Sequence, residues 1–204
     1  MNKTTKGKLQ VIFGPMFSGK TSELIRRIQR YSFGRYKCIV IRYTHDNRYC
    51  EDSIVTHDGY AITAIKTTKL GLIKNEIINY TVIGIDEGQF FPDVVEFCEE
   101  MCDAGKKIIV AALDGTFQRK PFGNALNLIP IAESVTKLNS ICMSCFKDAP
   151  FTRRVTDDTQ VELIGGIDKY MSVCENCYNI PSPSWGCPFQ NPQKVTKTVQ
   201  FELL

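Results

Sequence analysis

The sequence predicts an α/β fold, with a parallel sheet flanked by helices and a small second domain held together by cysteines. Short apolar strands alternate with amphipathic helices over residues 1–141, which is the pattern of βαβ units. Two Cys-x-x-Cys pairs then appear in a stretch rich in β-branched residues and turns. We therefore expect domains over residues 1–141 and 142–178, followed by a proline-rich and flexible tail over residues 179–204.

Composition restricts the class of protein. Of the 204 residues, 43% are apolar and 23% charged, and the net charge of +3 comes without a long basic run, which argues against a dedicated nucleic-acid binder. The longest apolar stretch, residues 108–113, is too short to cross a membrane, and the polar N-terminus lacks the apolar core of a secretory signal. We expect a cytoplasmic protein with reduced cysteines and neither nucleic acid nor membrane as a partner.

The first half of the chain supplies the expected sheet. The apolar runs 9–13 and 38–41 predict buried strands, and Leu24, Ile25, Ile28 and Tyr31 give residues 21–31 the period of an amphipathic helix. Residues 42–60 are polar and predict a long loop. Further on we expect a strand over 61–65 and a short helix over 70–78.

The pattern continues with a buried strand over 80–85 and a strand over 107–112. Between them, Pro92 and Gly105 bound a helix predicted over 92–104. Residues 113–124, with two glycines and a proline, predict a mobile loop. After Cys142, the β-rich runs 151–155 and 160–164 surround a polar turn and predict a hairpin.

The turn after the first strand carries the strongest motif. It satisfies the P-loop pattern G-x4-G-K-[ST], and it lies between a predicted strand and a predicted helix, which makes the sheet P-loop NTPase-type. Its glycines let backbone N–H groups approach phosphate oxygens, and the helix N-terminus favours negative charge. We expect Lys20 to reach the β/γ-phosphates of ATP and the hydroxyl of Thr21 to bind Mg²⁺. The eight residues are Gly14, Pro15, Met16, Phe17, Ser18, Gly19, Lys20 and Thr21.

A pair of acids, Asp86 and Glu87, ends the strand over 80–85. In P-loop proteins an acid at this position holds Mg²⁺, directly or through water. Strand ends often carry solvated acids, but the P-loop upstream favours function. We expect Asp86 to serve the metal and Glu87 to act as a base toward the phosphate acceptor.

The cysteines Cys142, Cys145, Cys174 and Cys177 predict a closed, structural Zn²⁺ site. Each x-x spacing lets a tight turn present two thiolates, and four thiolates complete a tetrahedron. The 28 residues between the pairs exceed the usual spacing, and the predicted hairpin accounts for the difference in a zinc-ribbon-like domain. Redox or packing cysteines are the alternative. Cys38, Cys98 and Cys102 fall on core elements and are expected to be buried.

One loop feature stays ambiguous. Gln118, Arg119 and Lys120 could neutralise phosphate, although an exposed basic loop is usually only solvated.

Five motifs in one order resemble the thymidine kinase family of the cellular cytosolic and poxvirus type (type II), over about residues 8–178. They are the P-loop, Asp86–Asp93, Ala111–Phe117, the four cysteines and Val161–Gly166. The resemblance implies transfer of the γ-phosphate of ATP to the 5′-hydroxyl of thymidine, and of deoxyuridine too, in pyrimidine nucleotide salvage. It also implies a homotetramer that is inhibited by dTTP.

The resemblance assigns roles to individual residues. Glu87 would be the general base. The ATP and phosphate end would include the P-loop together with Asp46, Asn47, Arg48, Asp86, Glu87, Gly88 and Gln89. The thymidine pocket would include Met16, Phe90, Leu113, Phe117, Phe122, Thr152 and Tyr170. A loop called the lasso would close on the nucleoside, and it comprises Val161, Glu162, Leu163, Ile164 and Gly165.

Two other functions are possible for a P-loop protein with a zinc site. A GTPase-type switch usually carries an Asn-Lys-x-Asp segment, which is absent here. An ATPase that reads nucleic acid through its zinc domain should carry a basic stripe, and the charge is near neutral. Stimulation of ATP consumption by DNA would distinguish it from a nucleoside kinase.

Overall fold

The structure is a computed structural model that describes residues 6–44, 53–55, 61–156, 158–161 and 165–180. Its main body is a seven-stranded sheet with the strand order β3-β4-β2-β5-β6-β1-β7. Six strands run parallel, and only β3 is antiparallel to its neighbour β4. The strands are β1 (Lys8–Phe13), β2 (Cys38–Tyr43), β3 (Ser53–Val55), β4 (Ala61–Thr67), β5 (Val82–Ile85), β6 (Lys107–Ala112) and β7 (Ser134–Lys137). The predicted parallel sheet flanked by helices is therefore confirmed.

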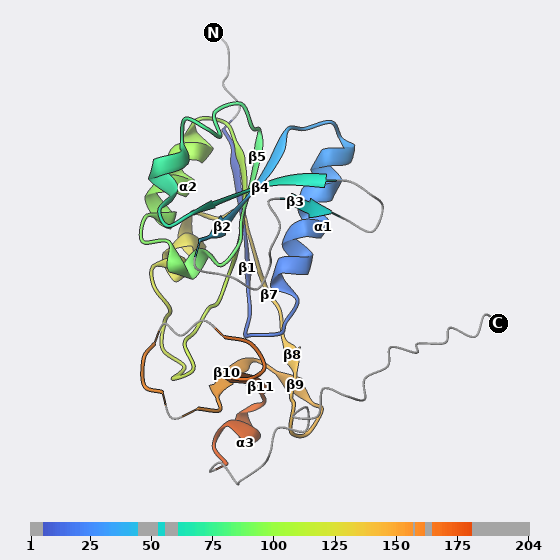
Figure 1. Cartoon of the computed structure of the whole chain (residues 1–204), viewed down its shortest axis with the longest axis vertical. Helices are drawn as coiled ribbons and strands as arrows, with labels where there is room; N and C mark the ends of the chain where they lie inside the picture. Colours follow the sequence, from blue (N-terminus) through green and yellow to red (C-terminus); the bar gives the residue numbers. More distant parts are fainter. Residues whose placement is uncertain (1–5, 45–52, 56–60, 157, 162–164, 181–204) are drawn as a thin grey trace, which may run out of the picture.

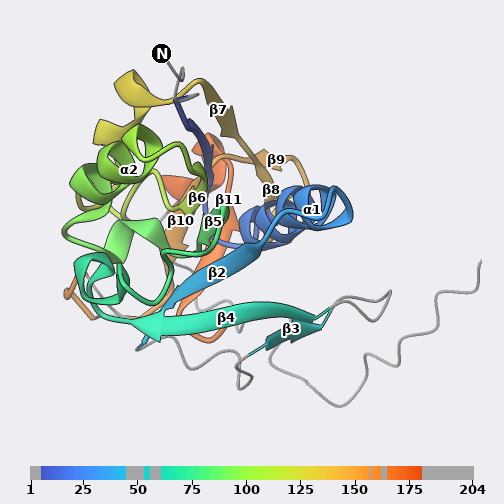
Figure 2. The same ribbon diagram turned by 90° about the horizontal axis from the view of Figure 1, so that it is seen from above.

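Helices cover both faces of the sheet (Figure 2). Helix α1 (Lys20–Phe33) packs on one face, where Ile12 and Ile109 meet Leu24 and Ile28 of the helix. Helix α2 (Val94–Asp103) covers the other face together with the 3-10 turns η1 (Leu70–Ile73) and η3 (Ala125–Ile131). Because successive side chains of a strand point to opposite faces, the unbroken apolar runs supply both cores.

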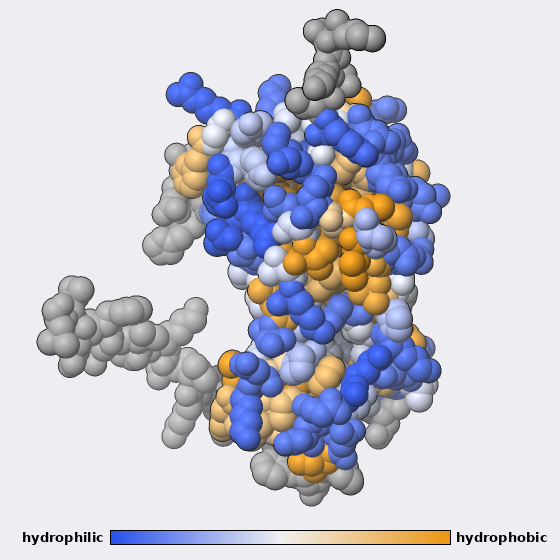
Figure 3. All heavy atoms as spheres, turned by 180° about the vertical axis from the view of Figure 1, so that it is seen from behind, coloured by the Kyte–Doolittle hydropathy of each residue, from blue (hydrophilic) through white to orange (hydrophobic). Residues whose placement is uncertain are grey.

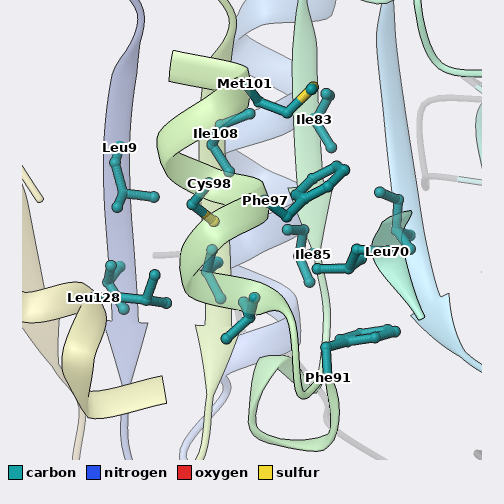
Figure 4. Close-up of a cluster of buried hydrophobic side chains, with 14 of the residues drawn as sticks. Leu9, Leu70, Ile83, Ile85, Phe91, Phe97, Cys98, Met101, Ile108 and Leu128 are labelled. Carbon is teal, nitrogen blue, oxygen red and sulfur yellow. The ribbon is translucent and has the colours of Figure 1, made fainter. Parts of the chain in front are cut away.

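The core beneath α2 is closely packed (Figure 4). Phe97, Cys98 and Met101 project from α2 onto strand side chains such as Ile83 and Ile108. Phe97 is 1% exposed and Cys98 is fully buried. Burying a side chain such as Phe97 contributes roughly 1.5–3 kcal/mol. Of the three cysteines expected in the core, Cys98 and Cys102 are buried and Cys38 is half-buried.

Local signals set the helix boundaries. Gly19, with φ of 79°, precedes α1 in the left-handed conformation, and Gly34 follows the last turn. Helix α2 starts two residues after Pro92 and ends before Gly105, so the predicted helix is confirmed with slightly shorter bounds.

Several elements differ from the predictions. The helix expected over 70–78 is only the 3-10 turn η1, although Ile77 beyond it is buried. Strand β3 interrupts the expected loop over 42–60, and η3 and β7 were not predicted. Strand β7 is short, mixed in polarity and pairs with β1 alone among the described residues, so its sequence carries no strand periodicity.

A smaller lobe lies at one end of the sheet (Figure 1). It contains β8 (Ser140–Ile141), β9 (Asp148–Ala149), β10 (Phe151–Arg154), β11 (Tyr170–Val173) and α3 (Glu175–Tyr178). Among the described residues the hairpin predicted between 151–155 and 160–164 is not found, because β10 pairs antiparallel with β11, and residues 162–164 of that prediction lie outside the described part of the chain. The described residues Gln160 and Val161 form no strand, and their carbonyls face an arginine side chain instead.

Exposed apolar side chains gather on the back of the molecule. The view in Figure 3 shows apolar atoms over its upper half, the side on which Figure 2 places η3 and β7. Ile129 of η3 and Val135 of β7 are 46% and 44% exposed. Among the described helices, none is long and apolar enough to cross a membrane.

Candidate active site and metal centre

Residues 14–19 form a tight turn between β1 and α1, and Lys20 and Thr21 begin the helix. The Nζ of Lys20 donates a hydrogen bond to the carbonyl of Pro15 at 2.7 Å, and the hydroxyl of Ser18 donates to the same carbonyl at 2.9 Å. Phe17 and Gly19 both have positive φ, which bends the chain around the lysine. Lys20 is 9% exposed, so this cation lies close to the main chain at the helix N-terminus, where anions are favoured.

The acid that follows β5 faces this turn. The Thr21 hydroxyl donates to the two carboxylate oxygens of Asp86 at 3.0 and 3.1 Å, and Asp86 is 3% exposed. Burial, and to a smaller extent the nearby charge of Glu87, raise the pKa of Asp86 to about 7, although the Thr21 hydrogen bond and the charges of Lys20 and Arg42 oppose the shift. A divalent cation here would favour the charged carboxylate.

Glu87 is held in place by its neighbours. Its backbone has φ of 56°, and its Oε2 accepts a hydrogen bond from Nε2 of Gln89 at 2.6 Å. The Oε1 of Gln89 in turn accepts from the main-chain N–H of Leu113 at 2.9 Å. Between them, Gly88 lies so close to β6 that a Cβ would come within 2.6 Å of Val110. The carboxylate of Glu87, which is 8% exposed, therefore has a defined position.

An apolar cluster adjoins these groups. It brings together side chains from four separate segments of the chain, which are Met16, Phe90, Leu113, Phe117, Phe122 and Tyr170. The rings of Phe90 and Phe122 meet edge to face with centroids 5.5 Å apart. Thr152 connects the smaller lobe to this cluster, because its hydroxyl accepts a hydrogen bond from the N–H of Met16 at 2.9 Å.

The remaining expected site residues divide into two groups. Val161 is 42% exposed and Gly165 is half-buried, and neither belongs to the apolar cluster. The others lie outside the described residues, and they are Asp46, Asn47, Arg48, Glu162, Leu163 and Ile164.

The cysteine pairs come together as predicted. The Sγ atoms of Cys142, Cys145, Cys174 and Cys177 lie within 4.8 Å of one another, and those of Cys145 and Cys174 are 3.5 Å apart. Tetrahedral Zn–S bonds of about 2.3 Å require sulfurs about 3.8 Å apart, so the cluster could hold such an ion.

The four cysteines differ in pKa, which is lowered for Cys142 and Cys174 and raised for Cys145 and Cys177. Burial alone would raise the pKa of Cys142, but hydrogen bonds from the main chain at Cys174, Ser144 and Cys145 lower it to about 6. A thiolate stabilised in this way is the form that binds metal.

Three residues join the smaller lobe to the apolar cluster, and sequence reasoning left Arg119 ambiguous and gave no role to the other two. Arg119 is neither a free cation nor merely solvated, because it pairs with Glu175 at 2.9 Å and stacks over the rings of Phe151 and Tyr178. The hydroxyl of Tyr178 donates to the carbonyl of Phe117 at 2.7 Å. The third residue, Arg154, is buried beside Phe117. No pattern in the sequence predicts these contacts. Arg119 lies in a basic loop, Tyr178 is a single tyrosine, and Arg154 is one of two neighbouring arginines in a strand.

The site residues follow the carboxyl ends of β1, β5 and β6, where open parallel sheets hold ligands. Fold and site together define a class of protein: an α/β ligand-binding protein with a buried acid pair and an attached four-cysteine lobe.

Known sequences identify the family within that class. The sequence model described as thymidine kinase matches residues 7–178, and the chain belongs to this family. It is 57% identical over 172 residues to a thymidine kinase of vaccinia virus (strain Ankara), covering 84% of this chain and 97% of that one. It is also 57% identical to the cytosolic thymidine kinase of Homo sapiens, covering 85% of this chain and 74% of that one. The corresponding protein of Gallus gallus is 54% identical, over 85% and 77% of the two chains.

Proposed function

We propose that the protein transfers the γ-phosphate of ATP to the 5′-hydroxyl of thymidine, and of deoxyuridine, in pyrimidine nucleotide salvage. The observation that carries this proposal is the convergence of Lys20, the Asp86–Glu87 pair and the apolar cluster at the carboxyl ends of the parallel strands. Family membership supports the choice of thymidine as acceptor. Phosphoryl transfer needs positioning and charge neutralisation more than covalent chemistry, and this set of groups supplies both.

The phosphates of ATP would lie over residues 14–21, which we interpret as a P-loop. The N–H groups of the turn and the start of α1 would bind phosphate oxygens, and Lys20 would exchange its bond to the Pro15 carbonyl for the β/γ-phosphates. By the family resemblance, Asp46, Asn47, Arg48, Gly88 and Gln89 would complete this end of the site.

The residues present fit a Mg²⁺ ion, which would neutralise charge on the transferring phosphate when bound with ATP. The hydroxyl oxygen of Thr21 and a carboxylate oxygen of Asp86 lie 3.0 Å apart, and oxygens of these kinds are the ligands that this ion prefers.

Glu87 would act as the general base toward the 5′-hydroxyl. The hydrogen bond from Gln89 holds the carboxylate of Glu87 in a defined position, and a carboxylate positioned in this way can accept the proton. The thymine would lie among the residues of the apolar cluster beside Thr152, with main-chain groups of the lasso residues 161–165 at its polar edge.

The four cysteines would hold a structural Zn²⁺ ion that fixes both ends of residues 142–178, which we take as a separate small domain. The donor set and its compact geometry fit this ion. The ion would do no chemistry, because four thiolates leave no open position.

The assembly and its regulation are further parts of the proposal. The exposed apolar residues Ile129 and Val135 at the β7 edge favour self-association, which the family resemblance suggests is a homotetramer. dTTP would inhibit by carrying the thymine and the phosphates in one molecule. A cytoplasmic location is supported by the cytosolic relatives, and no nucleic acid or membrane is required.

The reaction is tested by measuring ATP consumption with each of the four deoxynucleosides. Thymidine should be the preferred acceptor, and product analysis should give dTMP. Activity that depends on DNA and not on a nucleoside would overturn the proposal.

A further inference from the structure

Arg154 is a buried cation that belongs to none of the sequence motifs. It ends β10 and is 7% exposed. Its Nη1 donates hydrogen bonds to the main-chain carbonyls of Asp158, at 2.9 Å, and of Gln160. Its Nη2 donates to the hydroxyl of Tyr170 at 2.6 Å and to the carbonyl of Val161 at 3.4 Å. One side chain thus joins two strands of the lobe to the segment between them.

The flat face of the same guanidinium contacts two rings of the apolar cluster. Its Cζ lies 3.9 Å from the centre of the Phe117 ring and 5.1 Å from that of Tyr170. Both rings belong to the apolar cluster in which we place the nucleoside base. A guanidinium can stack on a ring and donate in its own plane at once, whereas an ammonium cannot do both.

The register of β10 explains why Arg154 reaches the apolar cluster. In β10, Thr152 and Arg154 share one face, and Thr152 binds the N–H of Met16 in the phosphate-binding turn. Arg153 points to the other face and donates to the carbonyl of Cys177 at 3.1 Å. Thr152 and Arg154 therefore face the apolar cluster, and Arg153 between them faces the cysteine cluster.

We propose that Arg154 is a positioning residue for the nucleoside base. It holds Tyr170 and Phe117 in place and fixes the carbonyls of residues 158, 160 and 161, so that the pocket is formed before thymidine arrives. The proposal rests on the function proposed above, because it assumes that the pocket binds thymidine. The proposal involves no contact between Arg154 and ATP. A substitution of Arg154 should therefore change the binding of the nucleoside selectively.

The test compares Arg154→Met, Arg154→Lys and a matched control at an exposed arginine of α1, Arg30→Met, in the full-length protein. We measure KM for thymidine and for ATP, kcat, zinc content and Tm for each. Arg154→Met should raise KM for thymidine about 10–100-fold, the effect of losing one or two buried hydrogen bonds, and KM for ATP should stay within about twofold. Arg154→Lys should lie between wild type and Arg154→Met. Arg30→Met, which removes an exposed arginine of α1, should keep KM for thymidine.

Each outcome decides the proposal. A KM for thymidine within about twofold of wild type in Arg154→Met overturns it, and so does a parallel rise in both KM values, which is the result of general damage. If Arg154→Met does not fold, the comparison of Arg154→Lys with wild type decides by the same criterion. Wild-type protein that does not phosphorylate thymidine would instead refute the proposed function, so the two failures are distinguishable.

Discussion

Glu87→Gln isolates proton removal from the other contributions to the reaction. The side chain is buried, and its Oε2 accepts a hydrogen bond from Gln89, whose own Oε1 is fixed by the N–H of Leu113. A glutamine at position 87 can present its carbonyl oxygen to Gln89 and keep this contact. The variant should therefore fold normally and bind thymidine, while the group that accepts the proton is lost.

The expected loss follows from the role of the residue. A positioned general base typically contributes about 10²–10⁴-fold to the rate. At about 1.4 kcal/mol for each tenfold change, this corresponds to roughly 3–5 kcal/mol of transition-state stabilisation. Because the change affects only the transition state, kcat and kcat/KM should fall equally, with KM for thymidine nearly constant.

The assay is steady-state formation of dTMP under saturating ATP, with thymidine binding measured separately by calorimetry. Glu99→Gln is the matched control, because it removes the same charge from the exposed face of α2 and should leave kcat unchanged. A kcat for Glu87→Gln within about tenfold of wild type, less than the smallest effect of a positioned base, would refute the assignment.

Replacing Cys145 by serine should reduce the expected one zinc per chain in elemental analysis and lower both Tm and thymidine affinity, because Tyr178 and Arg119 join α3 to the segment carrying Phe117. Full zinc content with wild-type affinity would contradict this coupling. Deoxycytidine should be a poorer substrate than thymidine by about 10²–10⁴-fold in kcat/KM, because it reverses two hydrogen-bonding groups against main-chain partners that cannot exchange roles. A ratio within about tenfold would exclude main-chain readout by residues 161–165. Burial and the charge of Glu87 raise the pKa of Asp86 to about 7, so the folded protein retains a proton that the unfolded chain releases near its ordinary value of 3.8. The free energy of unfolding without metal should therefore decline as pH rises from about 4 to 7, and urea denaturation of Asp86→Asn should lack this decline. An identical pH dependence in that variant would assign the effect to other groups.

Local patterns predicted much of the fold and the chemical parts of the candidate site. Largely apolar runs, interrupted in β1 by Gln10, indicated β1, β2, β5 and β6 because strands buried on both faces leave few polar positions. The turn over residues 14–21, the acids after β5 and the cysteine pairs were visible as motifs with fixed spacing. The cysteine cluster is confirmed as a compact group, while its metal and the catalytic roles of Glu87 and Lys20 stay predictions.

The prediction failed where pairing depends on distant partners. Residues 160–164 have the composition of a strand, but β10 pairs with β11, which closes a longer loop and brings Arg154 opposite Tyr170. Composition does not encode which of two β-rich segments a strand will choose, because that choice depends on the packing of both against the sheet. Strand β7 was missed for a related reason, since an exposed edge strand needs only one neighbour and no apolar periodicity.

The sequence by itself determined the class of fold, the family and the residue types available for phosphate, metal and proton chemistry. Short, local sequence patterns are enough to specify each of these. Only the tertiary structure decided how the parts are joined. It brought Gln89 to Glu87, Thr21 to Asp86, and Tyr178 to the carbonyl of Phe117. These contacts connect residues whose spacing along the chain varies from two to 65 positions, and their geometry follows from sheet order and helix packing. The burial of Arg154 is likewise a property of the folded chain alone, since nothing in the pair Arg153-Arg154 distinguishes the cation that faces the pocket from the one that faces the cysteines.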